Sequence, residues 1–593
     1  MEMQEARSAR LWMILIATLV GLLFLGVLGQ LVRLHILRRG YVPPTYYVVK
    51  RDLLALRGRI LDRNGKPLAE SLPGRMVFID PQDPKLEGPR VDRSTLPLDV
   101  AKVLGVREED VIKAFRETKN RSVRLCVTAD ESIIHEVLAR QAASTNRFAG
   151  IGMEEREIRS RPNGARLCHV LGYVNADGVG TYGIEQKYDR QLQGEKGRII
   201  TAVDAARREI RSRRAEDIPE IQGNDIWLTI DNNVQYIIEN ALSKALETYN
   251  ADSGIILVQH VKTGELLGMA TLPSFDPQHY SSVDTNLWKN IAISRNFEPG
   301  SVMKVITVAA ALQHGVITER STFDVGRAGI WYYAGRPLRD HAYGVITPRE
   351  ILAKSSNIGT AMIGLRLATP APQKGFRHEY ERLWYCFKSM GFGERVGLEL
   401  PGEEGGILPH WSRWSKLSPT RMTIGQGVAV TAVQLCNAYA TIANKGVRMR
   451  PTVIKEIRSA EGALIERNEP EVLGRPLSAR VCHSMLTMMQ AVTDRSQGGT
   501  ARRAALKDYT VAGKTGTGQI PSNGVYNNQD YNASFVGIYP ATAPELVILV
   551  NVEKPRGIYH QGGNVAAPVF ANVAEDIGHY LGIPADKHPE VKE

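Results

Sequence analysis

The chain has 593 residues, of which 43% are hydrophobic and 23% charged, and its formal net charge is +11. This composition is typical of globular domains and excludes a disordered or collagen-like protein, and the length predicts two or more domains. A net positive charge suits an anionic partner. Since no nucleic-acid-binding module is recognisable, we expect an envelope protein beside anionic lipid or polymer and no nucleic-acid partner.

Residues 11–32 form an uncharged, apolar run near the N-terminus. As a helix rising about 1.5 Å per residue it spans about 33 Å, enough to cross a hydrocarbon core of about 30 Å. No cleavage site of the Ala-x-Ala kind follows, so we expect an uncleaved transmembrane anchor behind a short cytoplasmic tail, residues 1–10. Arginines flank the run on both sides, so the charges alone do not fix its orientation.

The region after the anchor carries few chemical signals. Asn64-Gly65 lies between two short apolar runs and predicts a tight hairpin turn. Polar segments with helical patterns dominate from Pro81 to about Phe148. Beyond them, His169–Val174 is interpreted as a strand and Gly183–Tyr188 as a helix that docks on it.

A domain boundary is expected near Gly223. Ile226–Ile230 predicts a strand, and Asp231 is a suitable N-cap for a helix over Val234–Leu246. The Lys262-Thr263-Gly264 segment lies between two apolar runs and is interpreted as a hairpin turn.

A Pro-Gly turn then leads directly into an apolar helical pattern, in Glu298-Pro-Gly-Ser-Val-Met-Lys-Val305. Ser301 and Lys304 are three residues apart, which places both side chains on one face of a helix. A serine hydroxyl attacks poorly unless a neighbour removes its proton, and a lysine does so only if its pKa is lowered. The pair suits a nucleophile and its base, although Ser-x-x-Lys alone is a weak signal.

Two downstream segments strengthen this interpretation. Ser355 offers a hydroxyl that can relay protons, and Asn357 offers an amide able to orient a substrate peptide bond. Lys514 offers a cation that can hold a carboxylate and keep Lys304 neutral by repulsion. Val511–Ile520 predicts a strand in which Gly516 allows a substrate backbone to approach closely, so that a peptide can add as an extra strand.

The remaining pattern predicts strands flanked by helices, which indicates a mixed α/β domain of about 370 residues, 223–593. Its expected later elements are a helix over Thr431–Ala443, strands over Thr510–Gly516, Ala533–Ile538 and Leu546–Val552, and a helix over Pro568–Leu581.

Five cysteines are scattered without a Cys-x-x-Cys pair: Cys126, Cys168, Cys386, Cys436 and Cys482. Their number and spacing indicate no disulfide framework, and no zinc-binding spacing is present, so neither a metal nor another cofactor is expected.

Taken together, these motifs resemble those of class B penicillin-binding proteins, the peptidoglycan D,D-transpeptidases, and more closely the division-type FtsI/SpoVD branch. One departure is Arg161, because relatives often carry Arg-x-Tyr-Pro where this chain has Arg-Ser-Arg-Pro. Besides the three motifs with Ser301, Ser355 and Lys514, the resemblance rests on Arg57–Gly65, Gly183–Glu185, Glu298–Ser301, Gly425–Gly427, Gly498–Arg502, Gly562-Gly563 and Ala567–Phe570.

The resemblance implies a single N-terminal transmembrane helix, an elongated α+β pedestal resembling a dimerisation domain at 40–222, and a transpeptidase domain with a mostly antiparallel sheet at 223–593. It also implies that the catalytic domain lies on the outer, periplasmic side of a bacterial cytoplasmic membrane.

For the site, the resemblance implies that Ser301 attacks the penultimate D-alanine carbonyl of a peptidoglycan stem peptide, with Lys304 as base and Ser355 as proton relay. Backbone N–H groups of Ser301 and Thr517 would form the oxyanion hole. The substrate would be held by Asn357, Lys514, Thr515, Gly516 and Thr517, and β-lactam antibiotics would acylate Ser301.

The expected function is therefore cross-linking of septal cell wall, beside an FtsW-like glycan polymerase that contacts residues 11–32 and with other division proteins. Three alternatives stay open: a β-lactamase, which would turn over antibiotic rapidly; a penicillin sensor, which would need further membrane spans; and a division scaffold whose catalysis is dispensable.

Overall fold

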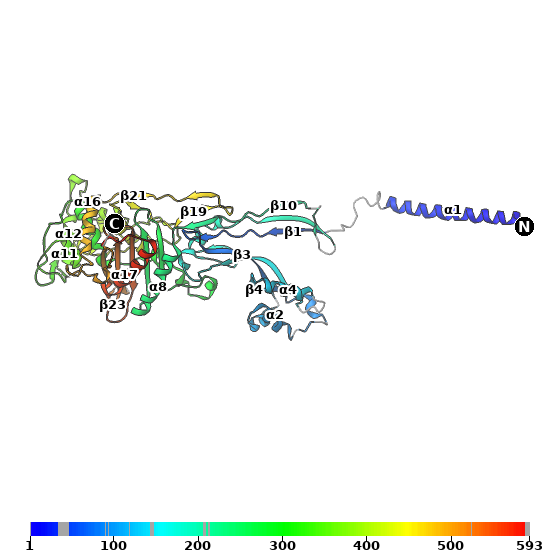
Figure 1. Cartoon of the computed structure of the whole chain (residues 1–593), viewed down its shortest axis with the longest axis horizontal. Coiled ribbons are helices and arrows are strands. Elements are labelled where there is room, and N and C mark those ends of the chain that lie inside the picture. The colour runs from blue at the N-terminus through cyan, green and yellow to red at the C-terminus, as the bar shows by residue number, and fades with distance from the viewer. Residues whose placement is uncertain are drawn as a thin grey trace, which may run out of the picture. The chain divides into compact units, whose positions relative to one another are not determined.

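The structure is a computed structural model. Its backbone divides into two compact units, one made of Met1–Ala55 with Glu195–Ile221 and the other of Leu56–Gly194 with Gln222–Glu593 (Figure 1). It describes residues 2–33, 47–88, 91–92, 94–117, 119–142, 148–204, 209–211, 214–522 and 525–587.

The first unit contains the N-terminal helix and a small antiparallel sheet. Helix α1 (Glu2–Val32) includes the expected apolar run, and its side chains from Leu11 onward are exposed. Within the described residues it is the one helix long and apolar enough to cross a membrane. In the sheet, β8 (Gly197–Val203) pairs with β1 (Tyr47–Leu53), β10 (Glu216–Ile218) and β9 (Glu209–Ile210).

The second unit begins with a seven-stranded sheet. Its central hairpin joins β2 (Ile60–Leu61) to β3 (Pro67–Ile79) through Gly65, whose φ of +84° suits glycine, so the expected turn is confirmed. The other strands are β4 (Val123–Thr128), β5 (Ile151–Ser160), β11 (Asp225–Leu228), β19 (Ile454–Arg458) and β20 (Leu464–Arg467).

Three helices pack near β4 and form a small core around Val77, Val100 and Val111. They are α2 (Leu96–Leu104), α3 (Glu108–Phe115) and α4 (Glu131–Ala142). Strand β4 was not expected within this polar stretch. It forms because its residues pair with the long strand β3, a non-local partner that a local pattern does not reveal.

The stretch His169–Val174 corrects the expectation of a strand. It begins as a short helix, α5 (Cys168–Leu171), and only Tyr173 and Val174 form a strand, β6. Leu167 and Gly172, with φ of 60° and 78°, flank the helix and break the extended backbone on both sides. The next segment is helical, as expected, in α6 (Gly183–Lys187).

The second unit also contains a five-stranded antiparallel sheet, in the order β13-β12-β24-β23-β22. These strands are β13 (Leu266–Leu272), β12 (Ser253–His260), β24 (Leu546–Glu553), β23 (Val525–Tyr539) and β22 (Ala512–Ser522). Strand β22 is therefore an edge strand. The Lys262-Thr263-Gly264 segment is the turn between β12 and β13, which confirms the predicted hairpin.

Helices cover both faces of this sheet. A Cβ on Gly254 of β12 would contact Leu242 of α8 (Asn232–Tyr249). Five residues later on the same strand, the Gln259 side-chain amide donates a hydrogen bond to Asn437 Oδ1 of α15 (Ala432–Ala443). Because side chains alternate along a strand, α8 and α15 lie on opposite faces, and the mixed α/β architecture is confirmed.

Two predicted helix starts are confirmed and one is corrected. Asp231 caps α8 by accepting hydrogen bonds from the backbone, and Thr431 caps α15 through a capping box. The last helix, α17 (Gly562–Leu581), begins six residues before Pro568, where it was expected. Pro568 has no N–H to donate to the Asn564 carbonyl oxygen one turn earlier. The proline is tolerated because the Tyr249 hydroxyl donates a hydrogen bond to that oxygen instead.

Candidate active site

The predicted nucleophile lies at the start of a buried helix. A short 3₁₀ turn, η6 (Gly300–Val302), continues directly into α10 (Met303–Gln313). Ser301 is half-buried in the turn, and Lys304 lies in the first turn of α10, where it is fully buried. The chain therefore turns into the helix at Ser301, which stays partly exposed.

Backbone contacts with two glycines fix this turn. Gly300, with φ of +59°, donates a hydrogen bond to the Gly425 carbonyl oxygen at 3.1 Å. A Cβ on Gly425 would lie 2.2 Å from the Gly300 carbonyl oxygen. Only a residue without a side chain permits this approach, which gives a physical reason for the Gly-Gln-Gly segment.

The same turn packs against the edge strand β22. A Cβ on Gly516 would lie 3.1 Å from the Pro299 carbonyl oxygen, and one on Gly518 would lie 2.7 Å from that of Glu298. The two glycines therefore allow the turn that carries Ser301 to lie directly on β22.

Lys304 connects the first motif to the second. Its Nζ donates to the Ser355 carbonyl oxygen at 2.5 Å, to Ser355 Oγ at 3.2 Å and to Asn357 Oδ1 at 2.7 Å. The Asn357 amide also donates to the Arg339 carbonyl oxygen at 2.9 Å, so both ends of that side chain are held.

Burial lowers the pKa of Lys304 to about 7, and the nearby Asp340 carboxylate opposes that shift. A substantial fraction of the lysine is therefore neutral near pH 7 and able to accept a proton. Burial is the main cause of the shift at Lys304, and the expected help from repulsion by Lys514 stays a prediction. Burial and the charge of Lys304 together lower the pKa of Lys514, which is also fully buried.

The second motif lies between two helices, α11 (Pro348–Ala353) and α12 (Asn357–Ala368). Ser355 adopts a φ of +57°, a strained conformation for serine that presents it at the junction. Ser356 caps α12, and its hydroxyl donates to the buried Asp340 carboxylate, which also accepts from the Ile358 backbone at 2.8 Å. Asp340 thus holds the helix start that positions Asn357.

The third motif lies on β22, which pairs with β23 on one side only. Lys514 Nζ donates to the Thr515 carbonyl oxygen at 3.2 Å, and the Thr515 hydroxyl donates to Thr500 Oγ1 at 3.0 Å. Thr517 Oγ1 accepts from the Gly562 backbone at 3.3 Å. Among the described residues, no strand pairs with its other side.

The structure thus brings together the eight predicted site residues, which are Ser301, Lys304, Ser355, Asn357, Lys514, Thr515, Gly516 and Thr517. Two further residues were missed. Thr500 was noted only as part of a shared motif, and Asp340 carried no signal, because it acts through contacts with a segment 16 residues later. Among the described residues, no cluster of three or more metal-ligating side chains is found.

This constellation provides a serine three residues before a partly neutral, buried lysine, together with a hydroxyl, an amide and an edge strand. Those are the parts that acyl transfer through a serine ester requires. Two family models match the chain: the penicillin binding protein transpeptidase domain over residues 254–575 and the penicillin-binding protein dimerisation domain over residues 52–228.

Curated relatives match over most of their length. Stage V sporulation protein D of Bacillus subtilis is 33% identical over 536 residues, which cover 90% of this chain and 79% of the relative. Peptidoglycan D,D-transpeptidase FtsI of Escherichia coli is 30% identical over 568 residues, which cover 92% of this chain and 88% of the relative.

Solved structures share the fold. Penicillin binding protein 3 of Mycobacterium tuberculosis, complexed with aztreonam, superposes with a TM-score of 0.68 at 26% identity and covers 90% of this chain and 98% of that one. A peptidoglycan synthetase from Bifidobacterium adolescentis gives a TM-score of 0.69 at 26% identity, and the match covers 91% of this chain and 98% of that one.

Proposed function

The chain belongs to the class B penicillin-binding proteins, the peptidoglycan D,D-transpeptidases of the division type, and from that premise we propose a role for each site residue and a place in septal wall synthesis. The enzyme is a serine-type transpeptidase acting on D-Ala-D-Ala. The observation that carries the residue assignment is the set of hydrogen bonds from buried Lys304 to Ser355 and Asn357, beside the turn that holds Ser301.

In the first step, Ser301 Oγ attacks the penultimate D-alanine carbonyl while neutral Lys304 takes the hydroxyl proton. The new ester bond forms as the amide bond to the terminal D-alanine breaks, and the proton passes through Ser355 to the leaving amine. Backbone N–H groups of Ser301 and Thr517 stabilise the oxyanion, which is commonly the largest electrostatic contribution in such reactions.

The donor peptide binds along the open edge of β22. Lys514, Thr515 and Thr517 hold its terminal carboxylate, Gly516 lets its backbone approach, and Asn357 orients its amide. The strand pairing of β22 on one side only supports this arrangement. β-Lactams mimic the D-Ala-D-Ala end and acylate Ser301 in the same position, which makes the enzyme a target of these antibiotics.

We assign residues 1–10 to a cytoplasmic tail, 11–32 to a single-pass anchor, 40–222 to a non-catalytic pedestal and 223–593 to the transpeptidase domain; residues 40–46 lie outside the described part. The catalytic domain then lies on the outer side of the cytoplasmic membrane. The exposed apolar surface of α1 supports a helix in lipid.

We also assign α1 the contact with an FtsW-like glycan polymerase, so that cross-linking accompanies septal polymerisation. Replacing residues 11–32 with an unrelated apolar helix should abolish co-purification with the polymerase while leaving membrane insertion unchanged. Unchanged co-purification would refute this assignment.

The residue roles are tested with a synthetic stem peptide ending in D-Ala-D-Ala and a D-amino acid as acceptor, by measuring released D-alanine and the exchanged peptide. Loss of the general base in Lys304→Met should slow release by about 10²–10⁴-fold. Lys262→Met, at an exposed lysine in the turn between β12 and β13, is the control and should retain wild-type rates. Equal rates for both variants would refute the role of Lys304.

A further inference from the structure

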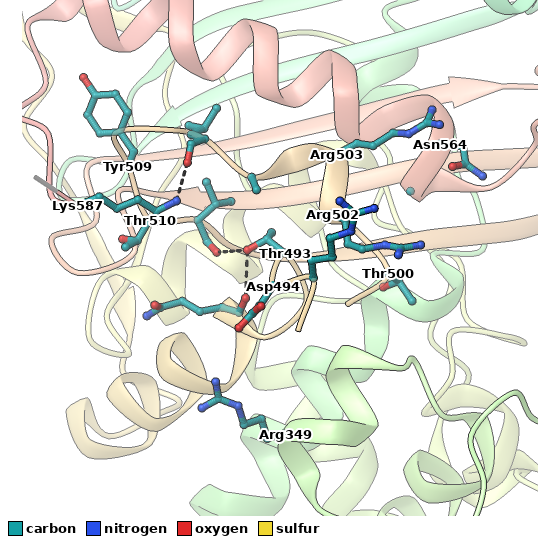
Figure 2. A pocket seen from close by; sticks show the side chains of 16 residues that line it. Arg349, Thr493, Asp494, Thr500, Arg502, Arg503, Tyr509, Thr510, Asn564 and Lys587 are labelled. Carbon is teal, nitrogen blue, oxygen red and sulfur yellow. Dashed lines mark hydrogen bonds between the residues drawn. The ribbon is translucent and has the colours of Figure 1, made fainter. Parts of the chain in front are cut away.

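A separate cavity of about 880 Å³ lies beside the first residues of β22 (Figure 2). Its wall is formed by α11, the segment after α16 (Ala479–Gln490), the 3₁₀ turn η9 (Arg502–Ala504) and the first turn of α17. The proposed function assigns it no role.

The cavity is strongly cationic. Within the described part of the chain, none of its lysine and arginine side chains forms an ion pair with a carboxylate. A concave site with unpaired charge of one sign concentrates ligands of the opposite sign. The charged residues of its lining are the cations Arg349, Arg495, Arg502, Arg503 and Lys587 and the single anion Asp494.

A hydrogen bond connects this cavity to the proposed catalytic centre. Thr500 lines the cavity, and its Oγ1 accepts from the hydroxyl of Thr515, which is proposed to hold the donor carboxylate. Gly563 lines it too, and a Cβ there would lie 2.2 Å from the Thr500 carbonyl oxygen. The cavity therefore starts immediately beside the carboxylate-binding part of β22.

The order of contacts along β22 places the cavity on one side of the scissile bond. Thr510 and Val511, just before the strand, line the cavity, whereas Thr517 and Gly518 contact the turn of Gly300 beside Ser301. A donor whose carboxylate is held at Thr515 and whose carbonyl meets Ser301 has its leaving D-alanine on the cavity side.

We propose that this cavity binds the acceptor stem peptide, an acidic peptide that carries a primary amine. This inference rests on the proposed transpeptidation through Ser301. The acceptor amine attacks the acyl-enzyme carbonyl, its new C–N bond forms as the bond to Ser301 Oγ breaks, and an amine proton returns to that oxygen. The incoming amine occupies the position that the leaving amine vacated, so the acceptor enters from the cavity side.

The exposed guanidinium groups of Arg502 and Arg503 pair with carboxylates of the acceptor. Both extend from η9, two and three residues after Thr500, and Figure 2 shows them beside Asn564 at the start of α17. Arginine is suited to carboxylates because its planar fork forms two parallel hydrogen bonds.

The test uses the full-length protein in detergent, with a donor peptide whose own amines are acetylated. Two acceptor probes are compared: a peptide with one free amine and two carboxylates, and the same peptide with both carboxylates converted to amides. The ratio of cross-linked to hydrolysed donor is measured against acceptor concentration by mass spectrometry. Acylation by benzylpenicillin, which involves no acceptor, reports whether each variant is folded.

In the double variant Arg502→Gln/Arg503→Gln, the half-saturating concentration of the acidic probe should rise about tenfold, as expected for lost charge-assisted hydrogen bonds. That of the amide probe should not change. The double variant Arg502→Lys/Arg503→Lys should lose less than the glutamine variant does. Arg480→Gln, at an exposed arginine at the far end of α16, should match wild type.

An unchanged half-saturating concentration for the acidic probe in a variant that benzylpenicillin still acylates would overturn the proposal. So would an equal change for both probes, because the cavity would then not recognise carboxylates. Absence of acylation of Ser301 in the wild type is a different result, since it would refute the proposed function itself.

Discussion

The ammonium nitrogen of Lys304 donates a hydrogen bond to Asn357 Oδ1 over 2.7 Å, although the two residues are 53 positions apart in the chain. This bond joins the first turn of α10 to the first residue of α12. Lys304 is fully buried at this junction, and burial lowers its pKa to about 7. A surface lysine, with an ordinary pKa near 10.4, would be almost fully protonated at neutral pH and unable to act as a base.

Acylation by a penicillin should therefore depend on pH. In the proposed mechanism only neutral Lys304 accepts the Ser301 proton, and the neutral form becomes populated as the pH rises through about 7. The second-order rate of acylation should fall about tenfold per unit below that midpoint and level off above it. Stopped-flow or mass-spectrometric rates between pH 5 and about pH 9 test this; a flat profile would contradict the assignment of the base.

Substitution of Asp340 should move that midpoint. Its carboxylate raises the pKa of Lys304, so Asp340→Asn removes a favourable interaction with the protonated lysine. The midpoint of the acylation profile should shift to lower pH. Asp324→Asn is the matched control, because that exposed aspartate only caps a local turn at Gly326. A midpoint that moves upward, or moves equally in both variants, would contradict the electrostatic role of Asp340.

The glycine contact beneath Ser301 makes a third prediction. A Cβ at Gly425 would lie 2.2 Å from the Gly300 carbonyl oxygen, so Gly425→Ala must displace the turn that carries Ser301. We expect acylation to slow by about 10²-fold, as small misplacements of reacting groups commonly do. Gly427→Ala is the control, since its φ of +74° is similar but nothing lies within 4 Å of the added Cβ.

Both glycine variants bear the cost of a positive φ, about 1–2 kcal/mol of stability. The difference between their acylation rates therefore isolates the contact with Gly300. If the two variants acylate at the same rate, the close approach of the two backbones does not position the nucleophile.

How far the sequence predicted this site depends on the kind of contact. Ser301, Lys304 and Lys514 were found because their motifs are short and each lies on one element, and the cap Asp231 because capping is local. Asp340 was missed because its role arises when a loop folds back onto the start of α12. The start of α17 was misplaced because Tyr249, more than 300 residues earlier, satisfies the carbonyl that Pro568 leaves open.

The cysteines supply a prediction independent of catalysis. All five are free, and burial raises the pKa of Cys168, Cys386 and Cys482 to about 12 and that of Cys436 further. Cys126 is only half-buried. Because the thiolate is the reactive form, iodoacetamide at pH 8 should label at most Cys126 in the native protein and all five in urea. Rapid labelling of Cys168 or Cys436 in the native protein would contradict the packing described.

The central claim is that Ser301 is the residue that becomes acylated. Intact-protein mass after incubation with benzylpenicillin, followed over hours for the wild type and for Ser301→Ala, tests it most directly. A stable adduct of one penicillin on the wild type and none on the variant is the predicted result. An adduct that hydrolyses quickly would indicate a β-lactamase, and no adduct on the folded wild type would contradict the account and favour a scaffold.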